Sequence, residues 1–231
     1  MREFLKKILM YGSLTVLKLL NLVTIFSYFK KIRDKIFYFT PEVFNPFFFV
    51  GSSQLFLQHL CIPKGARVLD MGTGSGILAI FASEQAKKVV ATDLSPHAIK
   101  NARINTKLNQ LSDKVELRRG NLFRPIKEKF DVILFNPPYY PLKPQTYMEA
   151  AWCCGPNYIF LRKFLKRARK YLTSKGFIQI SLSSYMNLKF FHKFIKMQKF
   201  HSFMIARKFL FFEILYIYIL VPEGQKEVEA K

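Results

Sequence analysis

A glycine-rich stretch between two acids is the first part of this 231-residue sequence that could do chemistry. Residues 70–76 read DMGTGSG after a short apolar run, and Asp93 lies 17 residues beyond the last glycine. Glycines allow a tight turn and let a ligand approach the backbone closely. A carboxylate such as Asp93 can accept two hydrogen bonds from ribose hydroxyls. The pattern indicates a nucleoside-bearing cofactor, although a dinucleotide oxidoreductase would also use such a turn.

A second motif, Asn136-Pro137-Pro138-Tyr139, follows a later apolar run. The side-chain carbonyl of Asn136 and the backbone carbonyl of Pro137 can accept both N–H groups of a planar amide or amino nitrogen. That grip would draw the nitrogen toward tetrahedral geometry and free its lone pair to attack a methyl group. The prolines stiffen the loop, and Tyr139 offers a flat face for packing a planar group. Because oriented reactants alone are worth roughly 7–11 kcal/mol, the motif predicts alkylation of a planar nitrogen without a separate base.

Alternating strand-like and helix-like stretches must position both motifs. They predict an α/β fold: a Rossmann-like, seven-stranded, mostly parallel sheet with helices on both faces and a C-terminal antiparallel strand pair. Ligands bind beyond the carboxyl ends of the strands in such sheets, and both motifs follow strands, so they should lie at one edge. The expected strands are 67–71, 88–93, 115–119, 130–135, 177–182, 203–208 and 213–221, and the expected helices are 77–86, 95–108, 157–172 and 187–200.

Together the motifs resemble the S-adenosylmethionine site of class I methyltransferases, since the second motif has no role in hydride transfer and Asp70 suits a ligand with a cationic end. Residues 89–105 (VVATDLSPHAIKNARIN), 120–123 and 130–139 are similar to the HemK-like N-methyltransferases, which include release-factor glutamine methyltransferases. The resemblance covers about residues 40–221. It implies S-adenosylmethionine as the cofactor and a catalytic group of Asn136, Pro137 and Tyr139. It implies cofactor binding by Asp70, Gly72, Thr73, Gly74, Gly76, Asp93, Leu94, Asn121, Leu122 and Asn136. The family usually carries Asp, which contacts the adenine amine, where this sequence has Asn121, so a charge is lost.

The resemblance leaves the methyl acceptor open between a protein glutamine and adenine N6, because the same motif occurs in adenine-N6 methyltransferases of DNA or RNA. Residues 140–141 and 150–157, with Glu213, resemble the glutamine-methylating members more closely. A protein glutamine is therefore the favoured acceptor, with adenine in RNA or DNA as the alternative. A binding module that keeps the fold without catalysis is a third interpretation, against which the intact Asn136 and Asp70 argue.

The charge of the chain is strongly basic, with 37 Lys and Arg against 15 Asp and Glu and a formal net charge of +22. Residues 150–212 contain no acid and 13 Lys or Arg. A basic surface over 162–208 predicts an anionic partner, either nucleic acid or a protein substrate lying on a ribosome. A merely solvated basic surface is the alternative interpretation.

The first forty residues are expected to form a basic, hydrophobic helical segment ahead of a methyltransferase domain (41–224) and a polar tail (225–231). Residues 8–29 carry one charge, Lys18, and could form a helix long enough to cross a bilayer. A membrane-spanning helix, an interfacial helix, and soluble helices that cover the domain or a substrate are the three interpretations.

The remaining polar residues add little chemistry. Residues 43–46, with Ser52 and Ser53, resemble the family's short entry segment and predict a lid over the cofactor. The three cysteines and four histidines show no disulfide or metal spacing, so no metal site is expected. A cytoplasmic protein is predicted, at the inner face of a membrane if residues 8–29 insert.

Overall fold

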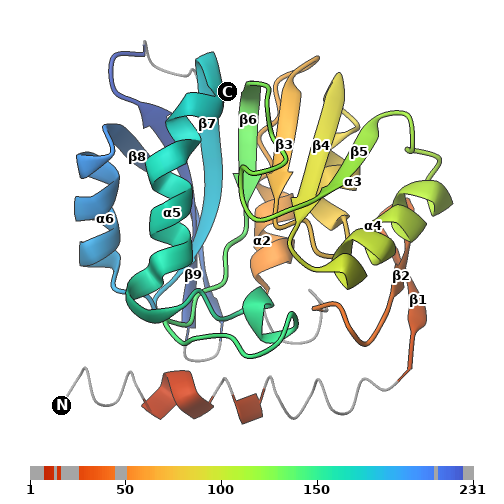
Figure 1. Cartoon of the computed structure of the whole chain (residues 1–231), viewed down its shortest axis with the longest axis horizontal. Helices are drawn as coiled ribbons and strands as arrows, with labels where there is room; N and C mark the ends of the chain where they lie inside the picture. Colours follow the sequence, from red (N-terminus) through yellow and green to blue (C-terminus); the bar gives the residue numbers. More distant parts are fainter. Residues whose placement is uncertain (1–7, 13–14, 17–25, 45–50, 211–212, 226–231) are drawn as a thin grey trace.

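The structure is a computed structural model of the chain, and it describes residues 8–12, 15–16, 26–44, 51–210 and 213–225. These residues form a seven-stranded sheet, covering helices and a separate hairpin (Figure 1). The hairpin strands are β1 (Tyr28–Ile32) and β2 (Lys35–Phe39); the sheet strands are β3 (Arg67–Met71), β4 (Lys88–Asp93), β5 (Val115–Arg119), β6 (Phe130–Phe135), β7 (Leu172–Ser183), β8 (Phe200–Leu210) and β9 (Glu213–Pro222). The α-helices are α2 (Ser52–Gln58), α3 (Ile77–Ala82), α4 (Pro96–Leu108), α5 (Ile159–Ala168) and α6 (Leu188–Met197).

The sheet has the strand order β5-β4-β3-β6-β7-β9-β8. Its first five strands pair in parallel, whereas β9 runs antiparallel to both β7 and β8. This confirms the predicted fold class, including the C-terminal antiparallel pair. The order reverses at β3, so β3 and its neighbours β4 and β6 carry the switch point at which open α/β sheets bind ligands.

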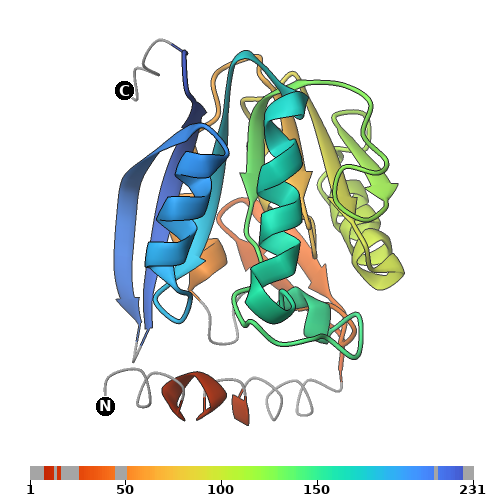
Figure 2. The same cartoon turned by 60° about the vertical axis from the view of Figure 1, so that its left-hand side comes forward.

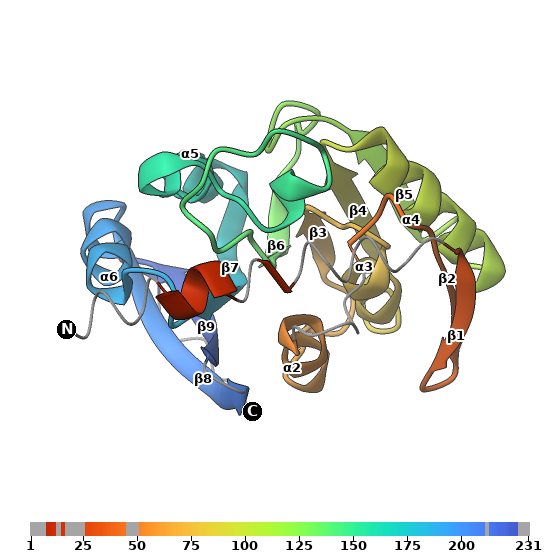
Figure 3. The ribbon, with the colours of Figure 1, turned by 90° about the horizontal axis from the view of Figure 1, so that it is seen from below.

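Helices cover both faces of the sheet, because its central strands are apolar on both sides. Val68, Leu69, Val132 and Ile133 are fully buried. Figure 3 shows α2 and α3 on one face and α5 and α6 on the other, and Figure 2 shows α5 and α6 side by side. Of the latter two helices, α5 turns lysines and an arginine toward solvent, and α6 turns lysines toward it.

Capping side chains fix where two helices begin. The predicted start of α4 is confirmed: Ser95 Oγ accepts a hydrogen bond from Ala98 N at 3.3 Å, and Pro96 occupies the first turn. Asn187 caps α6 in the same way, through Oδ1 and Phe190 N at 3.0 Å. Since α4 starts directly after β4, its cap also orders the backbone that carries Asp93.

Two local predictions are wrong. The strand predicted at 177–182 starts earlier, because β7 begins at Leu172, the last residue of the predicted helix 157–172, and carries a register shift against β6 between Phe130 and Val132. The helical segment predicted for residues 1–40 does not extend to its end, because residues 28–39 form the β1–β2 hairpin.

The predicted helix over residues 8–29 lies only partly within the described residues. Residues 8–12 and 15–16 are helical, residues 28–29 belong to β1, and residues 17–25 lie outside the described part. Of the helices that the structure describes, none has both the length and the apolar character needed to cross a bilayer. Met10 is buried beside Tyr140 and Trp152, so residues 8–12 pack against the loop that follows the Asn-Pro-Pro-Tyr motif.

Asparagines of α4 hold the hairpin to the domain. Asn105 Oδ1 accepts from Tyr38 N at 2.7 Å, and its Nδ2 donates to Tyr38 O at 3.0 Å. One turn further on, Asn109 bonds Ile36 N and Ile36 O at 3.0 and 2.7 Å. The two amides thus satisfy the outer edge of β2 as a neighbouring strand would. Asn105 Nδ2 also donates to Ser75 O at 2.8 Å, which connects the hairpin to the glycine turn.

Candidate functional site

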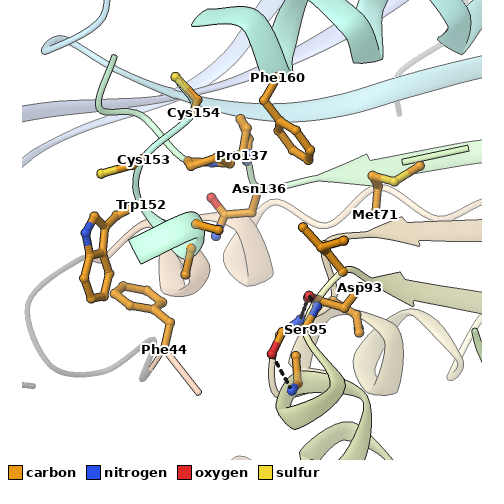
Figure 4. Close-up of a pocket in the computed structure, with 18 of the residues that line it drawn as sticks. Phe44, Met71, Asp93, Ser95, Asn136, Pro137, Trp152, Cys153, Cys154 and Phe160 are labelled. Carbon is orange, nitrogen blue, oxygen red and sulfur yellow. Dashed lines mark hydrogen bonds between the residues drawn. The ribbon is translucent and has the colours of Figure 1, made fainter. Parts of the chain in front are cut away.

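A cavity of about 320 Å³ opens at the carboxyl ends of β3, β4 and β6 (Figure 4). Both sequence motifs contribute to its wall, as the sequence predicted. Ten of the predicted site residues line it: Gly72, Thr73, Gly74, Asp93, Leu94, Asn121, Leu122, Asn136, Pro137 and Tyr139. The other two, Asp70 and Gly76, are not part of the lining.

The glycine turn is fixed to β4 by its backbone. The N–H groups of Gly72 and Thr73 both donate to Thr92 O, at 2.8 and 2.9 Å. Gly74 has a positive φ of 56°, and no atom lies within 4 Å of the position that a Cβ would take there. The turn therefore presents bare backbone to the cavity, which allows a ligand to approach closely.

Asp70 and Gly76 support the turn from behind, and their predicted role in cofactor binding stays a prediction. Asp70 is buried, and its Oδ2 accepts from Thr73 Oγ1 at 2.6 Å and from Ala79 N at 3.1 Å. Burial raises the pKa of Asp70 to about 7. At Gly76, an added Cβ would lie 3.1 Å from the Cβ of Ala102, so this glycine lets α3 and α4 pack closely.

Asp93, at the end of β4, is an acid that faces the cavity beside the glycine turn. Its Oδ1 accepts from Ser95 N and its Oδ2 from Gly74 N, both at 2.9 Å. A carboxylate offers about four lone-pair sites, so each oxygen retains capacity for a ligand hydroxyl. Burial raises the pKa of Asp93, and the backbone N–H groups of Ser95 and Gly74 oppose that shift. The carboxylate is thus held at a fixed position beside the bare glycine turn.

The segment after β5 forms the adjoining wall. Gly120 N donates to Asp93 O at 2.9 Å, which brings the end of β5 against the end of β4. Leu122 is buried with a positive φ of 50°, and Asn121 beside it is exposed. An apolar side chain and an amide therefore border the cavity where the sequence predicted contact with a base.

Asn136 lies on the opposite side of the cavity from Asp93 and Ser95 (Figure 4). Its Oδ1 lies within hydrogen-bond distance of Tyr139 Oη, at 2.8 Å, and of Ser181 Oγ, at 2.5 Å. Its Nδ2 donates to Ser53 Oγ at 3.2 Å and to Ser52 Oγ at 3.5 Å. The amide is therefore held from two sides, by α2 and by β7.

Tyr139 is buried, and its hydroxyl lies within hydrogen-bond distance of Asn136 and Ser181. Burial is the main cause that raises the pKa of the Tyr139 hydroxyl, so the group stays protonated and able to donate. The ring belongs to the main hydrophobic core and also lines the cavity. Its expected role as a flat face for a planar acceptor stays a prediction.

An aromatic wall closes the cavity beyond Asn136. Phe44 and Trp152 meet edge to face with their ring centroids 6.0 Å apart. The loop that carries Trp152 is tied to the motif, because Tyr140 N donates to Trp152 O and Cys154 N donates to Tyr140 O, both at 2.8 Å. Phe44 belongs to the predicted lid segment, whose residues 45–46 lie outside the described part. The cavity is also lined by Cys153, Cys154, Lys163 and Glu213.

Several residues of the site were not predicted from the sequence. Neither Trp152 nor Ser181 was given a role in the site. The only signal for Ser181 was a hydroxyl interrupting the apolar run of a predicted central strand, and β7 holds it fully buried. Glu213 was noted for its resemblance alone; it lines the cavity, and burial raises the pKa of its carboxyl.

In this sheet β9 alone runs against the other strands, and a glycine turn and an acid lie at the carboxyl edge. Together with the family match, these features define a class I, S-adenosylmethionine-dependent methyltransferase. Residues 36–213 match the family described as the methyltransferase small domain, and the chain belongs to that family.

Relatives and a solved structure agree with this class. The chain is 37% identical over 150 residues to a Methanocaldococcus jannaschii protein provisionally named a protein N5-glutamine methyltransferase, covering 62% of this chain and 74% of that protein. It is 32% identical over 140 residues to the release factor glutamine methyltransferase of Aliivibrio fischeri, covering 54% and 48%. The chain thus spans about half the length of this second relative. A methyltransferase structure from Pyrococcus furiosus has the same fold, with a TM-score of 0.63, 19% identity and coverage of 90% and 98%.

The residues of the cavity fit S-adenosylmethionine. Asp93 retains acceptor capacity for ribose hydroxyls, Gly74 leaves the space of a missing side chain, and Asn121 and Leu122 offer a polar edge and an apolar face for a base. Asp70 Oδ1 is buried without a hydrogen-bond partner among the described residues, so a carboxyl oxygen remains unsatisfied below the turn.

Proposed function

We propose that this methyltransferase modifies the side-chain nitrogen of a protein glutamine. The observation that carries the proposal is the fixed amide of Asn136, which faces Asp93 across one cavity and lies beside the Phe44–Trp152 wall. S-adenosylmethionine supplies the electrophilic methyl group of the reaction. The chain's own residues hold that cofactor on one side and an acceptor nitrogen on the other.

Cofactor binding is assigned to the β3, β4 and β5 ends. Gly72 and Gly74 present bare backbone, Asp93 accepts from hydroxyls, and Asn121 and Leu122 border the base. Asp70 and Gly76 keep the turn in shape without direct contact. The assignment predicts that removal of the Asp93 carboxylate weakens cofactor binding more than it slows the chemical step.

The acceptor is assigned to the Asn136 side of the cavity. Asn136 Oδ1 and the backbone carbonyl of Pro137 accept the two N–H groups of the acceptor, which orients its lone pair toward the cofactor side. The Phe44–Trp152 wall limits the entry of water. The nitrogen becomes a strong acid once alkylated and loses its proton to water, so no basic side chain is required.

The buried position of Tyr139 favours a small amide over an adenine base. A flipped base is read by stacking between aromatic or apolar side chains. Tyr139 is 7% exposed and its hydroxyl is held at 2.8 Å from both Asn136 Oδ1 and Ser181 Oγ, so little of its ring is open to a stacking base. The names of the two relatives, one provisional, agree with a glutamine acceptor.

Labelled methyl transfer into a cell extract tests the proposal. The purified chain and tritium-labelled S-adenosylmethionine should place label in protease-sensitive material, and mass spectrometry should locate the methyl group on glutamine. Asn136→Ala should abolish transfer while the cofactor dissociation constant stays within about twofold. Label that is lost only after nuclease treatment would overturn the glutamine assignment.

Adenine N6 of RNA is the second candidate, and the cations of α5 and α6 are the observation that favours it. Arg167 of α5 and Lys170 just beyond it are exposed, as are Lys193 and Lys196 of the neighbouring α6, and Lys163 lines the cavity itself. Such a surface fits a phosphate backbone or a protein acceptor on a ribosome. The nuclease arm of the same experiment separates these two acceptors.

A further inference from the structure

Three oxygen atoms form a closed triangle beside the acceptor side of the cavity. Asn136 Oδ1 lies 2.8 Å from Tyr139 Oη and 2.5 Å from Ser181 Oγ, and the two hydroxyl oxygens are 2.8 Å apart. Ser181 is fully buried and Tyr139 nearly so, so neither hydroxyl can exchange these partners for bulk water. The triangle joins the end of β6 to the end of β7.

The triangle leaves one lone pair of Asn136 for an incoming N–H group. A carbonyl oxygen has two lone pairs, and each hydroxyl brings one hydrogen. At 2.8 Å, one of the hydroxyls must donate to the other, since two oxygens facing each other without a hydrogen would repel. Only one hydrogen therefore points at Oδ1.

The nitrogen of the same amide is held separately. Asn136 Nδ2 donates to the hydroxyls of Ser53 and Ser52, at 3.2 and 3.5 Å, and both serines are buried at the start of α2. The terminal torsion of an asparagine is otherwise broad and roughly two-fold, so a lone amide would lose its direction easily. Hydroxyls on both sides restrict that rotation.

We propose that Ser181 is a positioning residue that aims the Asn136 carbonyl at the acceptor nitrogen, an inference that rests on the proposed role of Asn136. It acts through Asn136 and touches neither substrate nor cofactor. Loss of its hydroxyl removes one hydrogen bond of the triangle, so Tyr139 alone holds Oδ1 and the carbonyl samples a wider range of directions. The methyl-transfer step should slow, whereas cofactor affinity should not change.

Ser181→Ala tests this in the labelled-transfer assay, with a cell extract as the acceptor mixture and saturating S-adenosylmethionine. One neutral hydrogen bond is worth about 1 kcal/mol, so the maximal rate at high extract concentration should fall about five- to tenfold. The dissociation constant of S-adenosylmethionine by calorimetry should stay within about twofold. Ser181→Thr, which restores a hydroxyl, should recover most of the rate.

Ser83→Ala is the matched control, because Ser83 is also fully buried and its hydroxyl donates to Ile80 O at 2.7 Å, away from the cavity lining. It should lower the melting temperature without slowing transfer. A wild-type rate in Ser181→Ala, a parallel loss of cofactor affinity, or no recovery in Ser181→Thr would overturn the inference. If Ser181→Ala does not fold, Ser181→Cys, a weaker donor of similar volume, is judged by the same outcomes. Full activity of Asn136→Ala is a different failure, since it would overturn the proposed function itself.

Discussion

The burial of Asp70 predicts an unusual dependence of stability on pH. Its carboxyl accepts hydrogen bonds only at Oδ2, from Thr73 and Ala79, while Oδ1 is buried without a partner among the described residues. Burial, which outweighs these hydrogen bonds, raises its pKa from 3.8 to about 7. Between these two values the folded chain binds more protons than the unfolded chain. The contribution of this group to stability is therefore full below pH 3.8 and is lost as the pH rises through 7.

The size of the loss follows from the shift in pKa. A rise from 3.8 to about 7 at roughly 1.36 kcal/mol per pKa unit gives a cost of up to about 4 kcal/mol above pH 7. Asp70→Asn keeps an acceptor for Thr73 and Ala79 and cannot ionise. The variant should therefore gain stability relative to the parent chain as the pH is raised from 4 to 8, most steeply below pH 7.

Urea denaturation of both chains at intervals between pH 4 and pH 8 measures this difference in the free energy of unfolding. Glu128→Gln is the control of opposite sign: hydrogen bonds from Arg118, at 3.0 and 2.7 Å, lower the pKa of Glu128 to about 2. That variant should lose stability at neutral pH. The loss should shrink as the pH falls from 4.5 toward about 2, so the control series is extended to that range. A difference for Asp70→Asn that stays constant across the pH range would refute the picture of a buried, half-satisfied carboxyl.

Three further substitutions test the cavity and its supports. Asp93→Ala should raise the dissociation constant of S-adenosylmethionine about 10- to 100-fold by calorimetry, because hydrogen bonds to a charged group are worth about 1.5–3 kcal/mol; an unchanged constant would contradict its assignment. Asn105→Ala should lower the free energy of unfolding, measured by urea denaturation, by about 2–3 kcal/mol, because three hydrogen bonds of a buried amide are lost. Asn109→Ala, at a more exposed site, should lower it less. An equal effect of the two substitutions would contradict the link to the glycine turn. Gly76→Ala should lower stability by about 1–2 kcal/mol, because its φ is +84° and the new Cβ would crowd Ala102; an unchanged melting temperature would show that α3 and α4 can separate at no cost.

The sheet could be predicted because its strands carry their signal locally. The apolar runs at 67–71, 88–93 and 130–135 became β3, β4 and β6 with the same bounds. The β1–β2 hairpin could not be predicted in this way, since its turn at Arg33-Asp34 lacks glycine and its outer edge is satisfied by amides more than sixty residues away. The secondary structure of residues 28–39 therefore depends on contacts with distant residues rather than on the local sequence pattern.

In the site, too, local features could be predicted from the sequence and tertiary contacts could not. The motif positions predicted a shared edge, and ten of the twelve predicted residues line the cavity. Asp70 and Gly76 lie outside the lining, and sequence order does not reveal which side of a turn a residue faces: the buried Asp70 and the cavity-facing Asp93 both stand at or near the end of an apolar strand. Ser181 was missed because its role exists only through a contact across 45 positions of sequence with Asn136.

The N-terminal elements are part of the site, although the motifs lie between residues 70 and 139. Asn105 binds both β2 and the glycine turn, so the hairpin stiffens the cofactor side. Ser52 and Ser53 of α2 bind the Asn136 amide, so the entry helix stiffens the acceptor side. Since each half of the cavity is braced by a segment that precedes β3, we expect the distance between cofactor and acceptor to depend on how residues 28–39 and 52–58 pack. A change in that packing should slow transfer even when every motif residue is intact.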